Sequence, residues 1–448
     1  MSQNTQDKGL ILIIGAGLAG LSVAYHLEQN AYDQYLILEA ESYVGGKARS
    51  EEKDGFTFDV TGHWLHLRDQ RIKEMISKVL PSDHFQTIQR ISRIWSHGVY
   101  TEYPFQGNLY GLPPHVIKEC LLGAIEAHTR QKLKDPSEQT QEPLNFEDFI
   151  KHYFGQGIAD HFMLPYNSKL WGVQASEITS LWCQRFVPKP NLADIVAGAV
   201  GCHQNKMGYN ASFIYPKKGG IQSVADAIAT HIPSDKIKRR HQVTQIDPIQ
   251  KKVTYTFEGQ SFEQSYHTLI NTNAMTKLID QIPTAPTEIK TAKSKLRANE
   301  VIYLNVALEG KLKQPDHWIY IPELKWPVYR IGSFSNAMPS MVPEGCSNLY
   351  VELSDRTTPV DELMPIIRKL LLEMDLIDAD QKIRYIQERR IQNAYVIYDF
   401  HYVENRQVLH QWLNEQEIFS IGRYGDWNYS SMEDALIDGL NLVERLLS

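Results

Sequence analysis

The chain has 448 residues, 42% of them hydrophobic and 22% charged, and its formal net charge is −7. This length allows two or three packed units with a large core, while the acidic balance argues against nucleic-acid binding. No stretch reaches the ~20 apolar residues of a membrane helix and no signal peptide opens the sequence, so we expect a cytoplasmic protein without membrane insertion.

The N-terminal segment has the pattern of a strand–helix–strand unit. Leu10–Ile14 is a continuous apolar run, as expected of a buried parallel strand. Leu18–Gln29 follows with helical periodicity, and Tyr35–Glu39 is a second apolar run that ends in an acid.

The middle of the chain, roughly 107–200, is predicted to be mainly helical. Pro113–Lys134 has apolar residues at helical spacing, Asp135–Pro143 is a polar, proline-bracketed loop, and Phe146–Phe154 starts a new helix. Later helices are predicted over Ile221–Ile232 and Asp434–Leu447. β-Branched and aromatic residues predict strands over Val253–Phe257, Val301–Leu308, Leu349–Glu352 and Tyr395–Phe400.

A glycine-rich turn separates the first strand from the first helix. Gly15, Gly17 and Gly20 form a GxGxxG motif. The first glycine would make the tight turn, the second would let the backbone approach a pyrophosphate, and the third would let helix and strand pack closely. Glu39, 24 residues after Gly15, is placed to accept hydrogen bonds from an adenosine ribose. The motif therefore predicts dinucleotide binding.

Two further segments favour FAD over NAD. GGKARS at 45–50 resembles the second glycine fingerprint of the amine-oxidase-like flavoproteins, in which glycines and an arginine approach the FAD diphosphate. GRYGDW at 422–427 resembles the C-terminal flavin motif of the same group, and the helix after Asp434 would direct its positive end at the ribityl-phosphate part. The residues expected to bind FAD are Gly15, Gly17, Leu18, Ala19, Gly20, Glu39, Ala40, Gly45, Gly46, Arg49, Val243, Arg423 and Gly425.

Over nearly its whole length the sequence resembles the UDP-galactopyranose mutases, in particular the eukaryotic-type ones. The segments that carry the resemblance are Thr61–His63, Tyr103–Gln106, Pro165–Gly172, Arg185 before Pro188, Tyr209–Phe213, Tyr320 with Pro322, Tyr329–Arg330, Ser335–Asn336, Tyr395 and Trp427–Tyr429. The resemblance implies interconversion of the pyranose and furanose forms of a UDP-hexose. Reduced FAD would attack the anomeric carbon through N5 and expel UDP, after reduction by NADPH or NADH.

This task asks for particular residue types. Expelling a diphosphate requires fixed cations, for which arginine is best suited, and Arg185 and Arg330 match the family arginines with that role. Gly62 and His63 match the segment against the flavin N5 edge, with Gly62 allowing close backbone approach. The positions that match substrate contacts are Phe105, Gln106, Phe162, Asn167, Trp171, Asn210, Tyr320, Tyr395 and Tyr429; aromatic core packing is the alternative for Trp171 and Phe162.

The resemblance also implies an architecture. We expect an α/β fold with a discontinuous Rossmann-like FAD-binding domain (1–100, 205–248 and 410–448), a helical insert domain (101–204) and a mainly antiparallel β-sheet substrate domain (249–409). The site should lie in the cleft between them. Residues 201–210 are the candidate for a loop that closes over substrate, and the oligomeric state cannot be predicted.

Three positions depart from the family pattern. Ala337 stands where a phosphate-contacting tyrosine is usual, Thr61 where glycine is common, and His66 where an apolar or aromatic residue lies beside the sugar. We therefore hypothesise that the reaction is kept while the sugar differs from galactose.

Two other functions stay open on the same fold. A redox flavoenzyme, an amine oxidase or desaturase, would need an apolar cage near N5 and no cations for a diphosphate. The positions of Arg185 and Arg330 therefore distinguish the two functions: if both face bulk solvent, the mutase prediction fails. A non-catalytic flavin-binding scaffold would not need so many polar positions. The four cysteines fit no CxxC pair, so we expect reduced thiols and no metal site.

Overall fold

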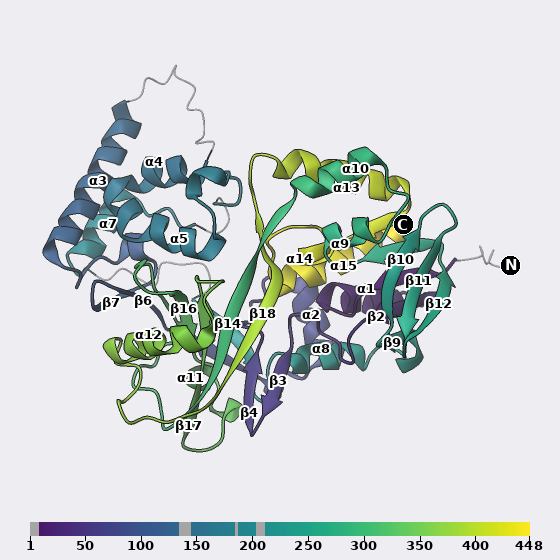
Figure 1. Cartoon of the computed structure of the whole chain (residues 1–448), viewed down its shortest axis with the longest axis horizontal. Coiled ribbons are helices and arrows are strands. Elements are labelled where there is room, and N and C mark those ends of the chain that lie inside the picture. Colours follow the sequence, from purple (N-terminus) through teal and green to yellow (C-terminus); the bar gives the residue numbers. More distant parts are fainter. Residues whose placement is uncertain (1–8, 134–144, 184–186, 203–210) are drawn as a thin grey trace.

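The computed structural model describes residues 9–133, 145–183, 187–202 and 211–448. The loop predicted at 135–143 lies outside these ranges. In Figure 1 a helical region lies at one end, long antiparallel strands cross the middle, and a parallel sheet lies at the other end. The helices of the first region are α3 (Pro114–Leu133), α4 (Phe146–Ile158), α5 (Leu164–Trp171) and α7 (Leu192–Ala199).

Five short parallel strands form the first sheet, in the order β19-β13-β1-β2-β9. They are β1 (Ile11–Ile14), β2 (Tyr35–Glu39), β9 (Ile237–Arg239), β13 (Thr268–Asn271) and β19 (Ile418–Ser420). Every residue of β1 is buried, as its continuous apolar sequence requires. The predicted strand–helix–strand unit is confirmed, with α1 (Leu18–Gln29) between β1 and β2.

Helix α15 (Met432–Leu447) packs closely along α1. A Cβ on Gly439 would lie 2.6 Å from the Cβ of Ser22, and the Ser22 hydroxyl donates to the carbonyl of Leu436 at 2.6 Å. This contact brings the C-terminal segment of the chain beside the N-terminal glycine turn.

The second sheet has seven strands in the order β18-β14-β17-β16-β15-β6-β7. They are β6 (Ser92–Ser96), β7 (Val99–Glu102), β14 (Arg297–Glu309), β15 (Trp318–Tyr320), β16 (Val328–Gly332), β17 (Cys346–Leu353) and β18 (Ile383–Ile397). Helix α12 (Val360–Glu373) shares one apolar cluster with Ile319, Ile331 and Val351.

Alternation along the strands places polar side chains on the other face of this sheet. Ile319 pairs with Ile331, which pairs with Val351, while the next register is Tyr320, Arg330 and Glu352. Because successive side chains of a strand point to opposite faces, these last three point away from α12 and towards the rest of the molecule.

Strand pairing crosses the predicted domain limits at 100 and 249, which stay predictions. β6 lies within the segment assigned to the cofactor domain, yet it pairs with β15 of the seven-stranded sheet. β13 lies within the segment assigned to the substrate domain, yet it pairs with β1. The three-stranded sheet of β10 (Gln242–Asp247), β11 (Lys252–Phe257) and β12 (Gln260–Ser265) is separate from both. Pairing between remote segments leaves no mark on local composition.

Most other element limits differ from the predictions by a few residues, but the strand predicted over Tyr395–Phe400 is only the end of the longer β18, which begins at Ile383. The strand predicted to reach Phe400 ends at Ile397 because Asp399 begins a turn, with its carboxylate accepting from the N–H of His401 at 3.0 Å. All four cysteines are free. Within the described parts of the chain, no helix is both long and apolar enough to cross a membrane.

Candidate active site

The two N-terminal glycine segments lie against each other where α1 begins. Gly17 forms an isolated parallel bridge with Gly45, and a Cβ on Gly46 would lie 3.2 Å from the Cα of Gly17. A Cβ on Gly20 would lie only 2.0 Å from the carbonyl oxygen of Gly15. No side chain caps the first turn of α1, which leaves its N–H groups to face an anion. This cradle of backbone fits the diphosphate of a dinucleotide.

Glu39 joins the two turns beside this cradle. Its carboxylate accepts from the N–H groups of Ala16 at 2.6 Å and Glu41 at 2.8 Å. Burial raises the pKa of Glu39, and these N–H donors oppose that shift. Each carboxylate oxygen keeps a second lone pair that could accept a hydrogen bond from a ribose hydroxyl. That contact stays a prediction.

The other predicted cofactor residues lie on α1, after β2 and on β10. Leu18 and Ala19 are buried in the first turn of α1, Ala40 is exposed after β2, and Val243 is buried on β10. Arg49 forms an ion pair with Glu51 at 2.9 Å and lies 4.6 Å from the ring centroid of Tyr43. Its contact with a diphosphate stays a prediction.

Arg423 connects the C-terminal motif with two predicted substrate residues. Its guanidinium carbon lies 4.6 Å from the ring centroid of Tyr429 and 5.4 Å from that of Tyr395. The two rings stack with centroids 5.6 Å apart. Nη1 and Nη2 donate to the carbonyls of Ser430 at 2.9 Å and Ala394 at 2.6 Å, which fixes the cation against the tyrosine pair.

Gly425 belongs to the same motif and packs on the ends of β13 and β19. A Cβ there would lie 2.7 Å from the carbonyl oxygen of Asn271 and 3.1 Å from the hydroxyl of Ser420. The absence of a side chain therefore lets the motif approach the carboxyl edge of the parallel sheet, the edge at which ligands bind in open α/β sheets.

Arg330 is held in one orientation by a buried carboxylate. Its Nε and Nη2 donate to Glu352 at 3.0 and 2.7 Å, and Nη2 also lies 3.3 Å from the hydroxyl of Tyr395. The side chain of Arg330 is 21% exposed and that of Glu352 is 0% exposed. Burial alone would lower the pKa of Arg330, but the Glu352 carboxylate helps to raise that pKa well above its ordinary value. Arg330 is therefore a permanent cation that is mostly buried, with a minor part of its side chain accessible to solvent.

Tyr395 is the residue on which several predicted positions converge. Besides Arg330, Arg423 and Tyr429, it meets Trp171 edge to face at 5.6 Å between centroids. The substrate residues predicted on the helical region and the cofactor motif at the C-terminus are thus brought together through one ring.

Gly62 and His63 lie beside this group. A Cβ on Gly62 would lie 2.5 Å from the hydroxyl oxygen of Tyr350, so a glycine makes room for that hydroxyl. Burial, and then the positive charge of Arg423, lower the pKa of His63 to about 4. Its imidazole is consequently neutral near pH 7, which does not suit a general acid.

A row of aromatic rings runs from the helical region to the seven-stranded sheet. Centroid distances are 4.9 Å for Phe105–Phe162, 5.3 Å for Phe162–Tyr166, 5.4 Å for Tyr166–Tyr320 and 5.0 Å for Tyr320–Tyr103. Phe105 is 0% exposed, so in this conformation it supports Phe162 from behind. Tyr320 and Tyr103, the last two rings of the row, are only partly buried.

The two predicted amide residues bond within the protein. Gln106 Nε2 donates to the carbonyl of Pro188 at 2.9 Å, and Asn167 Nδ2 donates to the carbonyl of Met163 at 2.7 Å. Asn167 Oδ1 accepts from the indole N–H of Trp171 at 3.3 Å. Trp171 is 2% exposed. This burial agrees with core packing, and its contact with Tyr395 also lets it support the site.

Arg185 and Asn210 lie outside the described residues, as does 203–210, most of the predicted closing loop. Their places in the site stay predictions.

The three departures from the family pattern have distinct surroundings. Thr61 has φ +58°, a left-handed conformation that a β-branched residue rarely adopts, which explains why glycine is common there. Nδ1 of His66 lies 3.1 Å from the carbonyl of Ser212, and burial lowers the pKa of His66 to about 4. Ala337 is buried in an apolar cluster, so a tyrosine at this position would require different packing.

Sequence reasoning missed two residues that contribute to this region. Glu352 lies two residues after Tyr350, on the same face of a strand whose other residues are mostly apolar. A buried acid on such a strand indicates a cation on a neighbouring strand, because a buried charge needs a partner. Arg90 gave no such signal. Its guanidinium carbon lies 4.4 Å from the ring centroid of Tyr103 and 4.6 Å from that of Trp318.

A backbone cradle for a diphosphate, a C-terminal glycine motif at the same sheet edge and an antiparallel sheet above them define a flavin-binding protein. The family described as flavin containing amine oxidoreductase matches residues 18–447, and this chain belongs to that family. Family and cradle together support FAD as the cofactor.

Among solved structures, the chain is similar to a reduced UDP-galactopyranose mutase, with TM-score 0.91 and 27% identity over 98% of this chain and 94% of the other. It also resembles a CLA-producing fatty acid isomerase from P. acnes, with TM-score 0.64 and 14% identity over 98% of this chain and 99% of the other. The second likeness shows the fold alone.

Curated relatives match over a shorter length. Protoporphyrinogen oxidase 2 of Arabidopsis thaliana is 21% identical over 51% of this chain and 48% of its own length. A protein named "Probable UDP-galactopyranose mutase" from Klebsiella pneumoniae is 21% identical over 49% of this chain and 53% of its own. The chain thus spans about half the length of these relatives.

Proposed function

We propose that this chain is a nucleotide-sugar mutase that interconverts the pyranose and furanose forms of a UDP-hexose, UDP-galactose or a related sugar. The observation that carries the proposal is the cation Arg330, fixed by Glu352 and joined through Tyr395 to Arg423 and Tyr429. The likeness to a reduced UDP-galactopyranose mutase over 98% of the chain supports it.

The protein's own residues would bind and neutralise the substrate. Arg330 keeps its charge at any working pH and presents it to a diphosphate without rotamer search, because Glu352 already fixes the guanidinium. Hydroxyl groups of Tyr395 and Tyr429 can donate to phosphate oxygens without adding charge. Tyr320, a partly buried ring of the aromatic row, offers an aromatic contact for a base.

The flavin would be bound mainly by backbone groups rather than by charged side chains. The glycine cradle and the first turn of α1 would hold the diphosphate, and Gly62 with neutral His63 would lie against the ring. FAD bound in its reduced form supplies a nucleophile for the anomeric carbon, with NADPH or NADH as the external reductant.

The test is turnover by the reduced protein. Purified protein is reduced with dithionite and given UDP-galactofuranose, and the products are separated by chromatography. Formation of UDP-galactopyranose only with reduced flavin supports the proposal, and a panel of UDP- and dTDP-sugars then ranks the sugar. Absence of both product and UDP binding would refute it.

Arg330→Ala, compared with a matched control, separates the role of Arg330 in substrate binding from its contribution to stability. We expect this variant to bind UDP at least tenfold more weakly and to turn over slowly, while FAD stays bound. Arg93→Ala is the matched control, because Arg93 is 22% exposed and pairs with the 1% exposed Asp316 on the α12 side of the same sheet. Loss of FAD from Arg330→Ala, or equal UDP affinity in both variants, contradicts the assignment.

A redox oxidoreductase is the second candidate, favoured by the family itself and by the protoporphyrinogen oxidase relative. Such an enzyme would turn over with air as the only oxidant and release hydrogen peroxide. The buried Arg330–Glu352 pair opposes this candidate, because it puts a fixed charge where an apolar cage would be needed.

A further inference from the structure

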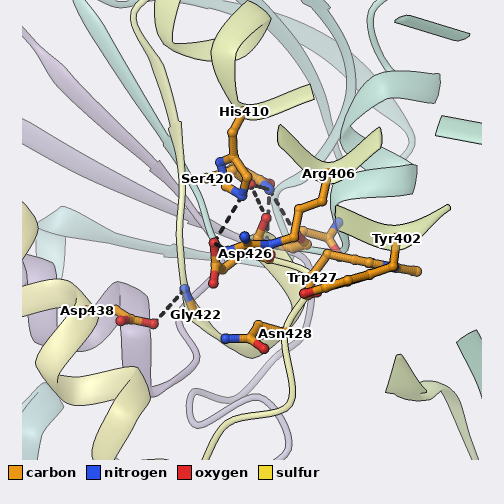
Figure 2. A network of polar contacts seen from close by, with 12 residues as sticks. Tyr402, Arg406, His410, Ser420, Gly422, Asp426, Trp427, Asn428 and Asp438 are labelled. Carbon is orange, nitrogen blue, oxygen red and sulfur yellow. Dashed lines mark hydrogen bonds and ion pairs between the residues drawn. The ribbon is translucent and has the colours of Figure 1, made fainter. Parts of the chain in front are cut away.

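A stripe of polar side chains leads from the end of β18 along α13 (Tyr402–Glu415). Tyr398, Tyr402, Arg406 and His410 follow one another at four-residue spacing. The last three lie in α13, where residues four apart share a face, and Tyr398 lies between β18 and α13. Figure 2 shows Arg406 and His410 converging on Asp426, with Tyr402 beside Trp427. We call these four residues the α13 clamp.

The two tyrosines of the clamp hold the end of the C-terminal flavin motif. The hydroxyl of Tyr398 accepts from the N–H of Tyr429 at 2.6 Å and donates to Oδ1 of Asn428 at 2.6 Å. The hydroxyl of Tyr402 donates to the carbonyl of Trp427 at 2.8 Å. Three successive residues are thus bonded by two side chains.

Of the other two clamp residues, Arg406 holds Asp426 by hydrogen bonds and His410 lies beside it. Nε of Arg406 donates to the Asp426 carbonyl at 2.6 Å, and Nη2 donates to the carboxylate of the same residue. Nε2 of His410 lies 3.0 Å from that carboxylate. One guanidinium therefore fixes both the backbone and the side chain of Asp426 (Figure 2).

The clamped segment has a conformation that local sequence would not hold. Trp427 has φ +52°, a left-handed backbone that is unfavourable for a bulky residue, and its side chain is 1% exposed. Such a residue persists where its surroundings over-determine it. The segment lies between Arg423 and Gly425 on one side and Tyr429 on the other, so its conformation sets where all three lie.

We propose that the α13 clamp is a set of positioning residues for FAD, which act through the backbone from Asp426 to Tyr429. The clamp residues do not need to touch the flavin. Hydrogen bonds are directional, whereas apolar packing would tolerate small shifts of this segment. The proposal rests on the FAD-binding family and not on the nucleotide-sugar activity.

The test measures FAD without any sugar. FAD-loaded Tyr398→Phe and Arg406→Gln are diluted and the released flavin is measured by its fluorescence; the reduction midpoint and melting temperature are measured in parallel. We expect the FAD dissociation constant to rise at least fivefold in each variant and the midpoint to shift. Arg406→Lys should recover part of the affinity, because lysine can reach one of the two oxygens.

Two control variants lose a comparable hydrogen bond or ion pair far from the α13 clamp, and so show the effect of such a loss on stability alone. Tyr100→Phe removes a hydroxyl that donates to the Met374 carbonyl at 2.7 Å, and Arg93→Gln removes the bidentate contact to Asp316. Both should lower the melting temperature while leaving the FAD dissociation constant within twofold of the wild type.

The proposal is overturned if the clamp variants lose melting temperature as the controls do but keep the wild-type dissociation constant and midpoint. If Arg406→Gln does not fold, Tyr398→Phe decides, since it removes one oxygen atom and leaves the ring. Because no nucleotide-sugar is used, failure of the proposed mutase activity would not affect this result.

Discussion

Replacing one member of the Arg330–Glu352 pair should destabilise the protein far more than replacing both. Glu352→Leu removes a carboxylate that accepts two hydrogen bonds at 3.0 and 2.7 Å and leaves Arg330, 21% exposed, without its counter-ion. Breaking a buried pair in this way costs about 3–5 kcal/mol. Water can reach part of the guanidinium, so we expect about 3 kcal/mol, at the lower end of that range.

Arg330→Met should cost more than Glu352→Leu, about 4 kcal/mol, because the abandoned carboxylate is completely buried. The double variant Arg330→Met/Glu352→Leu leaves no uncompensated charge and should come within about 1 kcal/mol of the wild type. The coupling free energy between the two sites is then several kcal/mol.

The assay is urea unfolding with saturating FAD, compared at constant m-value. The same cycle on Arg93 and Asp316 provides a matched pair on the opposite face of the sheet. The reasoning is refuted if each single variant loses less than about 1 kcal/mol or if the two losses simply add in the double variant.

Three further outcomes follow from particular residues. Thr61→Gly should raise the unfolding free energy by about 1 kcal/mol in urea titrations, because glycine accepts the φ of +58° without strain; a loss of stability would contradict this. Asp59 accepts from Ser50, Tyr215 and Ile221, yet burial raises its pKa to about 7, so its contribution to stability is complete below pH ~4 and is lost as the pH rises to about 7. Wild type should therefore lose about 2 kcal/mol more than Asp59→Asn between pH 5 and pH 7 in the same assay, and parallel pH curves would disprove the link. Gly20→Ala should yield protein without bound FAD, measured by its visible absorption, because the new Cβ would meet a carbonyl oxygen at 2.0 Å; a normally yellow variant would show that the turn can relax.

Local sequence was sufficient for the elements that bind the cofactor. The apolar runs at β1 and β2, the helical spacing of α1 and the glycines between them belong to one short stretch, and their geometry follows from steric rules that act over a few residues. The long helix at α3 and the strands at β14 and β17 were predicted for the same reason, with limits that moved by a few residues.

The candidate site was predicted only through resemblance and only in part. Arg330, Tyr395 and Tyr429 do come together, but nothing in the sequence near Arg330 indicates Glu352, because the two residues meet by register between β16 and β17. The α13 clamp is likewise invisible until α13 is placed beside the turn at Asp426, since its four-residue spacing also fits an ordinary helix face.

The sequence by itself determined that this chain binds a dinucleotide, because that function needs backbone in a fixed local shape, and glycine spacing encodes such a shape directly. Tertiary structure alone decided which strand belongs to which sheet, and which carboxylate holds Arg330. Those features depend on strand pairing and charge contacts between segments that are separate in the sequence, and the free energy of these contacts is realised only when the chain is folded.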